Sequence, residues 1–332
     1  IKTFQAEDEI AGITSVLGAA FTGDLGITAT SGPGIALKGE AMGLAVMAEL
    51  PIVIINVQRG GPSTGLPTKT EQSDLMQAMY GRNGEAPVPV LASATPGDCF
   101  FAAYEACRIA VKYMTPVVLL TDGYLANGSE PWQVPKVDDL PDFDVSFADE
   151  SNLADGQFLS YSRDKKTLAR PWAIPGTPGL EHRIGGIETE DLTGNVSYDP
   201  DNHHYMVETR AKKVDAIANE IASSEIFGSK SGDLLILSWG GTKGACRSAT
   251  EALKADGKKV GHLHLRWINP FPKDLGEKLI KFKNILIPEI NYGQLIKLIR
   301  AEFLVDAQGL NQVRGKPISS ADIQEASNKL IG

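Results

Sequence analysis

A largely apolar run that ends abruptly at an arginine and a glycine-rich loop constrains this sequence most. Residues 51–57 predict a strand buried on both faces. Gln58 and Arg59 follow, and the loop Gly60-Gly61-Pro62-Ser63-Thr64-Gly65 stops the strand. In open α/β sheets, ligands bind at the carboxyl ends of the strands, and a guanidinium there suits a carboxylate or a phosphate. The alternative, that Arg59 is structural and caps carbonyl groups or pairs with an acid, stays open.

Composition narrows the class of protein. The chain has 332 residues, enough for two domains, and a net charge of −9 with no basic run. We therefore expect neither a nucleic-acid partner nor an anionic membrane surface, and no apolar run is long enough to cross a membrane. The three cysteines, Cys99, Cys107 and Cys246, are scattered. This indicates a cytoplasmic protein with reduced thiols that itself binds neither an iron–sulfur cluster nor another metal.

Strand and helix patterns alternate in two parts of the chain, which is typical of doubly wound sheets. We predict two α/β domains with mostly parallel sheets, one over residues 1–130 and the other over residues 226–332. The segment 131–225 between them is rich in Pro, Gly, Asp and Asn, and we interpret it as a loop-rich connection. Three of its aromatic side chains are expected to be buried: Trp132, Tyr161 and Trp172.

Individual patterns predict further elements. Residues 1–4 look like a strand, residues 35–50 and 71–80 like helices, and residues 207–223 like a helix that returns to the second domain. Asp122 ends a buried strand, where a turn cap is favoured over a binding role. The run Gly240-Gly-Thr-Lys resembles a phosphate cradle, although a lone glycine turn is weak support. His262 and His264 share one face of a strand and are expected to be ordinary packed or surface histidines.

Two segments of the first domain could hold a ligand. Glu7, Asp8 and Glu9 precede a helix rich in Gly and Ala, where acids complement the helix dipole. The turn 31–34, Ser-Gly-Pro-Gly, lies between a short strand and a helix and would present free backbone N–H groups. For the acids the structural interpretation is helix capping, and for the turn it is a tight connection; both alternatives stay open.

Several motifs, in order, resemble the α subunit of 2-oxoacid:ferredoxin oxidoreductases, with the closest likeness to the 2-oxoglutarate enzyme. They are Ala6–Gly12, Ala29–Gly34, Gln58–Gly65, Leu119–Asp122, His264–Pro272 and Glu289–Gln294. The likeness covers nearly the whole chain. The Tyr-Pro-Ile-Thr-Pro segment that lies upstream in this family is absent, as is a further N-terminal domain. Because the first residue is Ile1, we expect that an N-terminal segment is missing.

The resemblance implies a fold, a cofactor and partners. It implies a thiamine pyrimidine-binding-like domain followed by a transketolase C-terminal-like domain. Thiamine diphosphate would be shared with a β subunit that carries the diphosphate-binding domain, Mg²⁺ and a [4Fe-4S] cluster. The enzyme would oxidatively decarboxylate a 2-oxoacid, with 2-oxoglutarate favoured, to an acyl-CoA and pass electrons to ferredoxin. Coenzyme A would be the co-substrate, and two copies of the heterodimer would assemble.

The resemblance also implies roles for the acids and the turn. Glu9 matches the glutamate that bonds the aminopyrimidine ring of the cofactor, with Glu7 and Asp8 as competitors. A glutamate in this role is expected to be shielded from water. Ser31 and Gly34 are expected to bind the cofactor.

Arg59 then suits the carboxylate of the substrate, with Gly60 and Thr64 in the loop that positions it. Two other functions stay open. One is an E1 β-type component of a 2-oxoacid dehydrogenase complex, which shares both domain types. The other is a non-enzymatic α/β protein that holds an anion at Arg59.

Overall fold

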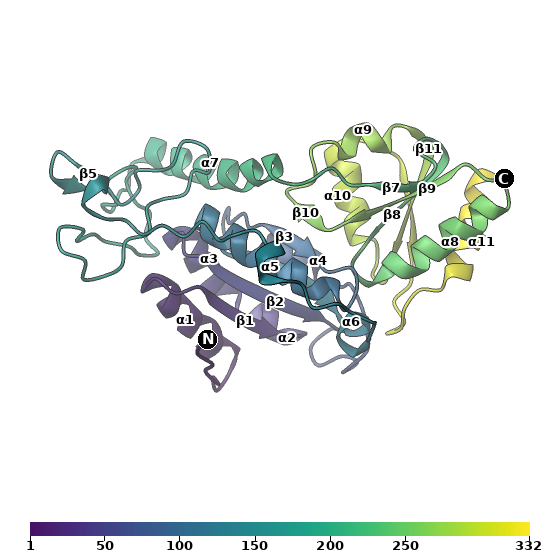
Figure 1. The fold of residues 1–332 in the computed structure, drawn as a ribbon, viewed down its shortest axis with the longest axis horizontal. Coiled ribbons are helices and arrows are strands. Elements are labelled where there is room, and N and C mark those ends of the chain that lie inside the picture. The colour runs from purple at the N-terminus through teal and green to yellow at the C-terminus, as the bar shows by residue number, and fades with distance from the viewer.

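Two five-stranded sheets organise the chain, and the computed structural model describes residues 1–332 (Figure 1). The first sheet has the order β1-β2-β4-β3-β10. Its strands are β1 (Gly26–Thr30), β2 (Ile52–Gln58), β3 (Val90–Ala92), β4 (Val117–Asp122) and β10 (Trp267–Asn269). The first four are parallel, as predicted, whereas β10 arrives from the C-terminal part of the chain and pairs antiparallel with β3.

The helices of this unit cover both faces of the sheet. They are α1 (Glu9–Phe21), α2 (Pro33–Leu37), α3 (Gly39–Ala48), α4 (Leu75–Tyr80), α5 (Asp98–Tyr113) and α6 (Gly123–Asn127). Alternate residues of β2 serve the two faces. Ile52 and Ile54 pack in the core that contains α1 and α3, while Val53 packs in the core that contains α5. A strand buried on both faces reads as a continuous apolar run, so the prediction for residues 51–57 is confirmed.

The second unit is also an α/β sheet covered by helices, and it confirms the predicted fold class. Its order is β12-β11-β8-β9-β7, with only β7 antiparallel to its neighbour. The strands are β7 (Ile226–Gly228), β8 (Gly232–Trp239), β9 (Val260–Leu265), β11 (Phe282–Glu289) and β12 (Ala307–Asn311). The helices are α8 (Lys243–Ala255), α9 (Leu275–Leu279), α10 (Gln294–Phe303) and α11 (Ser320–Ile331). No helix in the structure combines the length and apolarity needed to cross a membrane.

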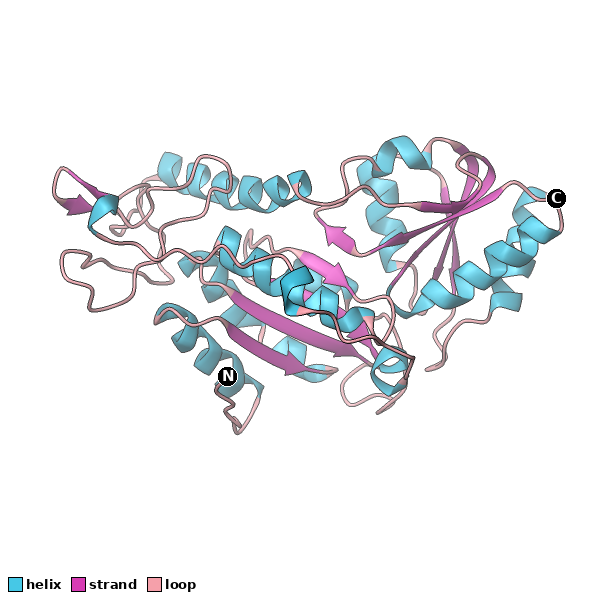
Figure 2. Cartoon of the chain, in the orientation of Figure 1, coloured by secondary structure: helices cyan, strands magenta, loops and turns pink.

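Loops make up most of the connecting segment (Figure 2). It holds a small hairpin of β5 (Leu153–Ala154) and β6 (Gln157–Phe158) before α7 (Pro200–Ala216). The predicted helix 207–223 therefore begins and ends earlier, because Asp199 caps its first turn and Pro200 suits its first position. Tyr161 and Trp172 are buried as expected. Domain boundaries at residues 130 and 225 stay a prediction.

Four further predictions are wrong in detail. Residues 1–4 form no strand, and Trp132 is 42% exposed. The predicted helix 35–50 is interrupted between α2 and α3, next to Gly39, and glycine is a poor helix former. The predicted helix 71–80 begins only at Leu75.

Gln72 explains that late start, because it is fully buried in the joint between the two units. Its side chain donates Nε2–H to the carbonyl of Trp239 at 2.8 Å and accepts from the N–H of Ile290 at 3.2 Å. Its backbone carbonyl accepts from Asn291 Nδ2 at 2.7 Å. These hydrogen bonds engage Gln72 with the second unit instead of with the first turn of a helix, and they join the two units.

Asp122 forms the second half of the joint. Its Oδ1 accepts from the backbone N–H of Leu125 and from the hydroxyl of Thr70, so it caps α6 as expected. Its Oδ2 accepts from the N–H of Gly241 at 2.9 Å. The turn that resembled a phosphate cradle is therefore occupied by a carboxylate of the same chain.

A buried ion cluster fastens the connecting segment to the first unit. Glu49 follows α3 and is 2% exposed. Its carboxylate accepts from Arg163 Nη1 at 2.6 Å and pairs with Lys213 of α7. Burial raises the pKa of Glu49, but the charges of Lys213 and Arg163 outweigh burial and lower it to about 2.

We expect Glu49→Gln to lower the free energy of unfolding at pH 7 by about 3–5 kcal/mol, because two buried cations lose their anion. The pKa in the folded chain lies below the ordinary 4.5, so this stability is present above pH 4.5 and is lost as the pH falls towards about 2. Chemical denaturation at a series of pH values measures it. Glu208→Gln, which removes an exposed pair with Lys212 on α7, is the control and should cost less than about 1 kcal/mol. Equal losses in the two variants would contradict the assignment.

Candidate functional site

The turn between β1 and α2 lies directly against Arg59. Gly32 in this turn has a φ of +57°, a conformation that favours glycine. A Cβ on Gly32 would lie 2.6 Å from Nε of Arg59 and 3.1 Å from its Cζ. No side chain fits at position 32, and because glycine has none, the guanidinium of Arg59 can reach the turn.

The same turn meets Glu9 two residues later. A Cβ on Gly34 would lie 2.7 Å from Oε1 of Glu9 and 2.0 Å from Oγ1 of Thr30. Gly34 is buried, and Ser31 at the start of the turn is partly buried. Glu9 and Arg59, fifty residues apart in the sequence, therefore contact one turn at the carboxyl end of β1.

The structure separates the three candidate acids. Asp8 is the cap of α1, and its Oδ1 accepts from the N–H of Ala11 at 2.8 Å. Glu7 is exposed. Glu9 alone of the three contacts Gly34. It is only partly buried in the single chain, so the expected shielding from water is incomplete within this chain.

Arg59 lacks partners that a purely structural arginine would have. It forms no salt bridge with any acid of the chain. Its Nε is buried without a hydrogen-bond partner, and so is the hydroxyl oxygen of Thr30. A buried polar group without a partner costs about 1–3 kcal/mol. Two such groups beside one turn indicate a site that is built for a polar ligand.

The loop after Arg59 returns on itself. The N–H of Gly60 donates to the carbonyl of Lys69 at 2.9 Å, and its carbonyl accepts from the N–H of Leu66 at 2.8 Å. Gly60 is buried at the base of the loop, whereas Thr64 is exposed within it. The structure therefore brings together Glu9, Gly34 and Arg59 and leaves Thr64 in solvent.

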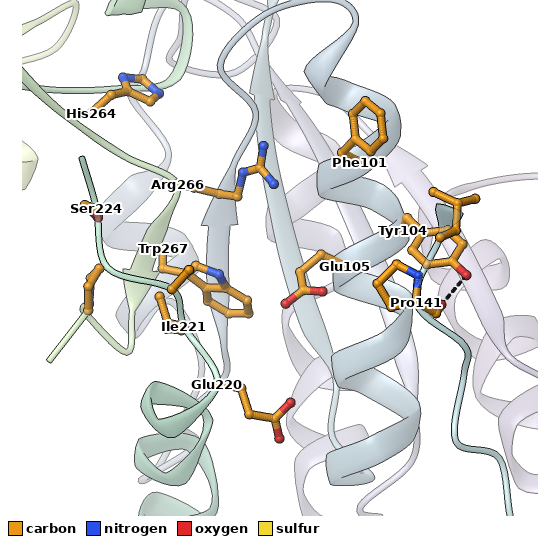
Figure 3. A pocket seen from close by; sticks show the side chains of 13 residues that line it. Phe101, Tyr104, Glu105, Pro141, Glu220, Ile221, Ser224, His264, Arg266 and Trp267 are labelled. Atoms are coloured by element: carbon orange, nitrogen blue, oxygen red, sulfur yellow. Dashed lines mark hydrogen bonds between the residues drawn. The ribbon is translucent and has the colours of Figure 1, made fainter. Parts of the chain in front are cut away.

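A separate cavity of about 450 Å³ lies between α5, β10 and the segment that follows α7 (Figure 3). Glu105, Arg266 and Trp267 line it, and the hydroxyl of Tyr104 at its edge donates to the carbonyl of Pro141 at 2.6 Å. None of the candidate site residues lines this cavity. A second cavity of about 450 Å³ lies beside α3 and α7, so volume does not single out a site, and the buried unpaired groups favour the strand end.

The two histidines of β9 are packed residues, as expected. The hydroxyl of Ser238 lies between them, 2.7 Å from Nε2 of His262 and 2.8 Å from Nδ1 of His264. Burial lowers the pKa of His262 to about 4 and the pKa of His264 well below 6.5, so both rings are neutral at pH 7. No group of three His, Cys, Asp or Glu side chains in the chain could hold a metal ion.

Sequence reasoning missed two contributors to the site. Gly32 lay within a motif, but only its contact with Arg59 reveals why a side chain is excluded there. Lys38 is 1% exposed, and its Nζ donates to the backbone carbonyl of Glu9 at 3.0 Å. A lysine inside a predicted helix carries no signal of burial, because most lysines lie on the surface.

Two family models match most of the chain. Residues 1–198 match the family described as pyruvate flavodoxin/ferredoxin oxidoreductase, thiamine diphosphate-binding. Residues 232–323 match core domain II of pyruvate:ferredoxin oxidoreductase.

Similar proteins and a similar structure agree with these matches. The chain is 54% identical over 317 residues to the 2-oxoglutarate oxidoreductase subunit KorA of Mycobacterium tuberculosis, a match that covers 95% of this chain and 48% of the relative. It is 33% identical to the 2-oxoglutarate synthase subunit KorA of Archaeoglobus fulgidus, over 88% of this chain and 76% of the relative. A solved 2-oxoglutarate:ferredoxin oxidoreductase from Magnetococcus marinus, with 2-oxoglutarate, coenzyme A and succinyl-CoA bound, superposes with a TM-score of 0.93 at 36% identity. That match covers all of this chain and 57% of the solved chain, so the chain spans about half the length of several relatives that it matches.

The close contacts at the turn predict that replacing Gly34 destabilises the chain. Gly34→Ala should lower the free energy of unfolding by about 1–3 kcal/mol, because its Cβ would collide with Thr30 and Glu9. Gly18→Ala in α1 is the matched control, since its Cβ meets no atom within 4 Å and alanine favours the helix. Urea denaturation compares the two variants. Similar stability of both would mean that Glu9 does not pack against the turn.

Proposed function

Because this chain belongs to the 2-oxoacid:ferredoxin oxidoreductase family, we propose that it acts as the α-type subunit of such an enzyme. The enzyme would oxidatively decarboxylate a 2-oxoacid, with 2-oxoglutarate favoured, form the acyl-CoA and pass two electrons to ferredoxin. The observation that carries this proposal is the convergence of Glu9 and Arg59 on the turn 31–34. An acid and a free guanidinium at one strand end supply a proton-holding group and a carboxylate-binding group side by side.

The residues around the turn suit thiamine diphosphate as a shared cofactor. The buried hydroxyl of Thr30 lacks a partner, and Gly34 leaves the carboxyl group of Glu9 beside a bare backbone. In this proposal Glu9 holds the aminopyrimidine ring and exchanges a proton with its ring nitrogen, while Ser31 and Gly34 line the same ring. When bound, the cofactor supplies a nucleophilic carbon and accepts the electron pair that decarboxylation releases.

Arg59 would bind the carboxylate of the 2-oxoacid. Its Nε is buried and unpaired, and a second charge-assisted bond through the same planar group would orient the substrate. Gly60 anchors the loop behind Arg59. Thr64 is exposed in this loop. It would contribute to substrate binding as part of the loop that positions Arg59.

The remaining parts of the reaction would come from partners. We propose a β subunit that holds Mg²⁺, the [4Fe-4S] cluster and the diphosphate-binding domain, and a second copy of the heterodimer. The half-exposed position of Glu9 supports a partner, because a covering surface would complete its shielding from water. A cytoplasmic location is proposed because Cys99, Cys107 and Cys246 form no disulfide.

The function can be tested by co-expressing the chain with its β partner and measuring 2-oxoacid-dependent reduction of ferredoxin. We expect activity with 2-oxoglutarate and coenzyme A, and Arg59→Lys should lower kcat/KM for the 2-oxoacid roughly 10- to 150-fold. This corresponds to the loss of one charge-assisted contact of about 1.5–3 kcal/mol, because lysine keeps the charge but not the fork. Cofactor and cluster content should stay normal. If Arg59→Lys dissociates the subunits at unchanged kinetics, Arg59 is a structural clamp.

Glu9→Gln tests the proton-holding role. Removing a side chain that transfers a proton during catalysis typically lowers the rate about 10²- to 10⁴-fold. We expect kcat of Glu9→Gln to fall by a factor in this range, while bound thiamine diphosphate is retained. Glu7→Gln is the matched control, because Glu7 is an exposed acid two residues away. Equal activity of the two variants would remove Glu9 from the mechanism.

A further inference from the structure

The cavity of about 450 Å³ beside α5 lies apart from the candidate site, and three parts of the chain form its walls (Figure 3). Phe101 and Tyr104 of α5 lie on one side. His264, Arg266 and Trp267, from the C-terminal part of the chain, lie on the other. Loops before and after α7 contribute the remaining walls. The motif that begins at His264 therefore lines a cavity, although it has no part in the proposed reaction.

Two carboxyl groups line this cavity, and both are already paired within the chain. The two oxygens of Glu105 accept from Arg108 Nε and Nη2, each at 2.9 Å. Glu220 accepts from Arg108 Nη1 at 2.9 Å and from the hydroxyl of Tyr113 at 2.7 Å. A cationic ligand would have to compete with these internal donors. The acids therefore do not make the cavity a site for a cation.

Arg266, in contrast, has free donors beside the cavity. Its Nη2 pairs with Asp98 at the start of α5, and Oδ2 of Asp98 accepts from the N–H of Ala94 at 2.9 Å. This pair fixes the guanidinium, whose Nε and Nη1 donate to no atom of the chain. The side chain of Arg266 is 38% exposed, and Nε2 of His264 also lacks a hydrogen-bond partner. The unpaired groups therefore suit a ligand that carries acceptors.

Aromatic rings give the cavity flat, fixed walls. Trp267 is 5% exposed and lines the cavity, while Phe101 is 39% exposed. The hydroxyl of Tyr104 donates to the carbonyl of Pro141 at 2.6 Å, and its ring lies 4.8 Å from the ring of Phe143, so the position of Tyr104 is fixed at both ends. Rigid aromatic side chains bind planar rings by stacking, and every nucleic-acid base offers such a face.

We propose that this cavity binds the base of a purine nucleotide, which is a flat ring with nitrogen acceptors along its edge. The base would stack on the aromatic walls, and Arg266 would donate to its acceptors. A volume of about 450 Å³ lies in the range of small-molecule sites. Because α5, the connecting segment and the C-terminal part of the chain all line the cavity, a bound nucleotide would hold these three parts together. The inference is independent of the proposed reaction.

Calorimetric titration of the purified chain with adenosine monophosphate tests the proposal. We expect saturable binding with a Kd below about 1 mM. Uridine monophosphate, which has the same phosphate and a smaller ring, should bind more weakly. Coenzyme A carries the same purine base as adenosine monophosphate and is titrated in parallel. Binding of both adenine compounds supports a site that accepts the base on either carrier, and binding of adenosine monophosphate alone supports a site for free nucleotides.

Two neighbouring phenylalanines provide a matched pair of variants. Phe101→Ala should weaken the binding of adenosine monophosphate about 5- to 150-fold, the range for the loss of one aromatic stacking partner. Phe100→Ala is the control, because Phe100 is also 39% exposed on α5 but does not line the cavity. Arg266→Lys keeps a charge for Asp98 but loses the planar fork, and it should weaken binding about 10-fold or more.

Several results would overturn the proposal. One is the absence of adenosine monophosphate binding. Another is equal affinity for the adenosine and uridine monophosphates, since the phosphate and not the base would then be recognised. Equal effects of Phe100→Ala and Phe101→Ala would place the ligand outside the cavity. If Phe101→Ala does not fold, unchanged affinity in Arg266→Lys overturns the proposal. Binding is measured without turnover, so these outcomes are separate from failure of the proposed function.

Discussion

Parallel pairing of β1, β2 and β4 is the constraint on which the site depends. The register pairs Thr30 with Asn56 and Gln58 with Asp122, so the three strands end along one edge of the sheet. Backbone hydrogen bonds fix this register, and a slip by one residue would turn every side chain to the other face. The three exits then have different tasks. The turn after β1 meets Glu9, the exit from β2 carries Arg59, and the exit from β4 joins the second unit through Asp122.

The joint between the units and the candidate site share one segment of chain. Residues 60–70 leave from Arg59, and the chain is next held at Gln72 by hydrogen bonds to the second unit. Gln294 of α10 adds a bond from its Nε2 to the carbonyl of Ser73 at 2.7 Å. The loop that follows Arg59 is therefore fastened at both ends, once to the first sheet and once to the second unit. The motif Glu289–Gln294, which the sequence offered only as a resemblance, supplies this second anchor.

The sequence predicted the fold class and the four parallel strands of the first sheet well, because strands buried on both faces leave continuous apolar runs such as residues 51–57. It did not predict β10. It predicted contacts between distant segments poorly. Nothing local shows that Gln72 is drawn into another unit, that Asp122 fills the turn at Gly241, or that Lys38 is buried. The candidate residues Glu9, Gly34 and Arg59 came from motifs and a family likeness, and the structure brings them together. Arg59 and Glu9 leave no room for a side chain at Gly32 and Gly34. This follows from distances in the folded chain, which the spacing of residues in the sequence does not reveal. The strand β12 and the helix α11 were missed. β12 has no apolar run, whereas Ile323, Ala326 and Leu330 of α11 recur at helical spacing after the cap Ser319, a signal that was overlooked.

The first sheet is completed by a strand that the ribosome makes late. β3 lies at residues 90–92, but the strand that pairs with its outer edge, β10, lies at residues 267–269. During synthesis the first unit can gather its four parallel strands while β3 still has an open edge, and such edges invite pairing with other chains. The edge closes only after the connecting segment and three strands of the second unit, β7, β8 and β9, have been translated. Biogenesis of this subunit therefore contains an interval in which a nearly finished sheet is exposed to aggregation, and its length is set by the 174 residues between β3 and β10 (267 minus 92, less one).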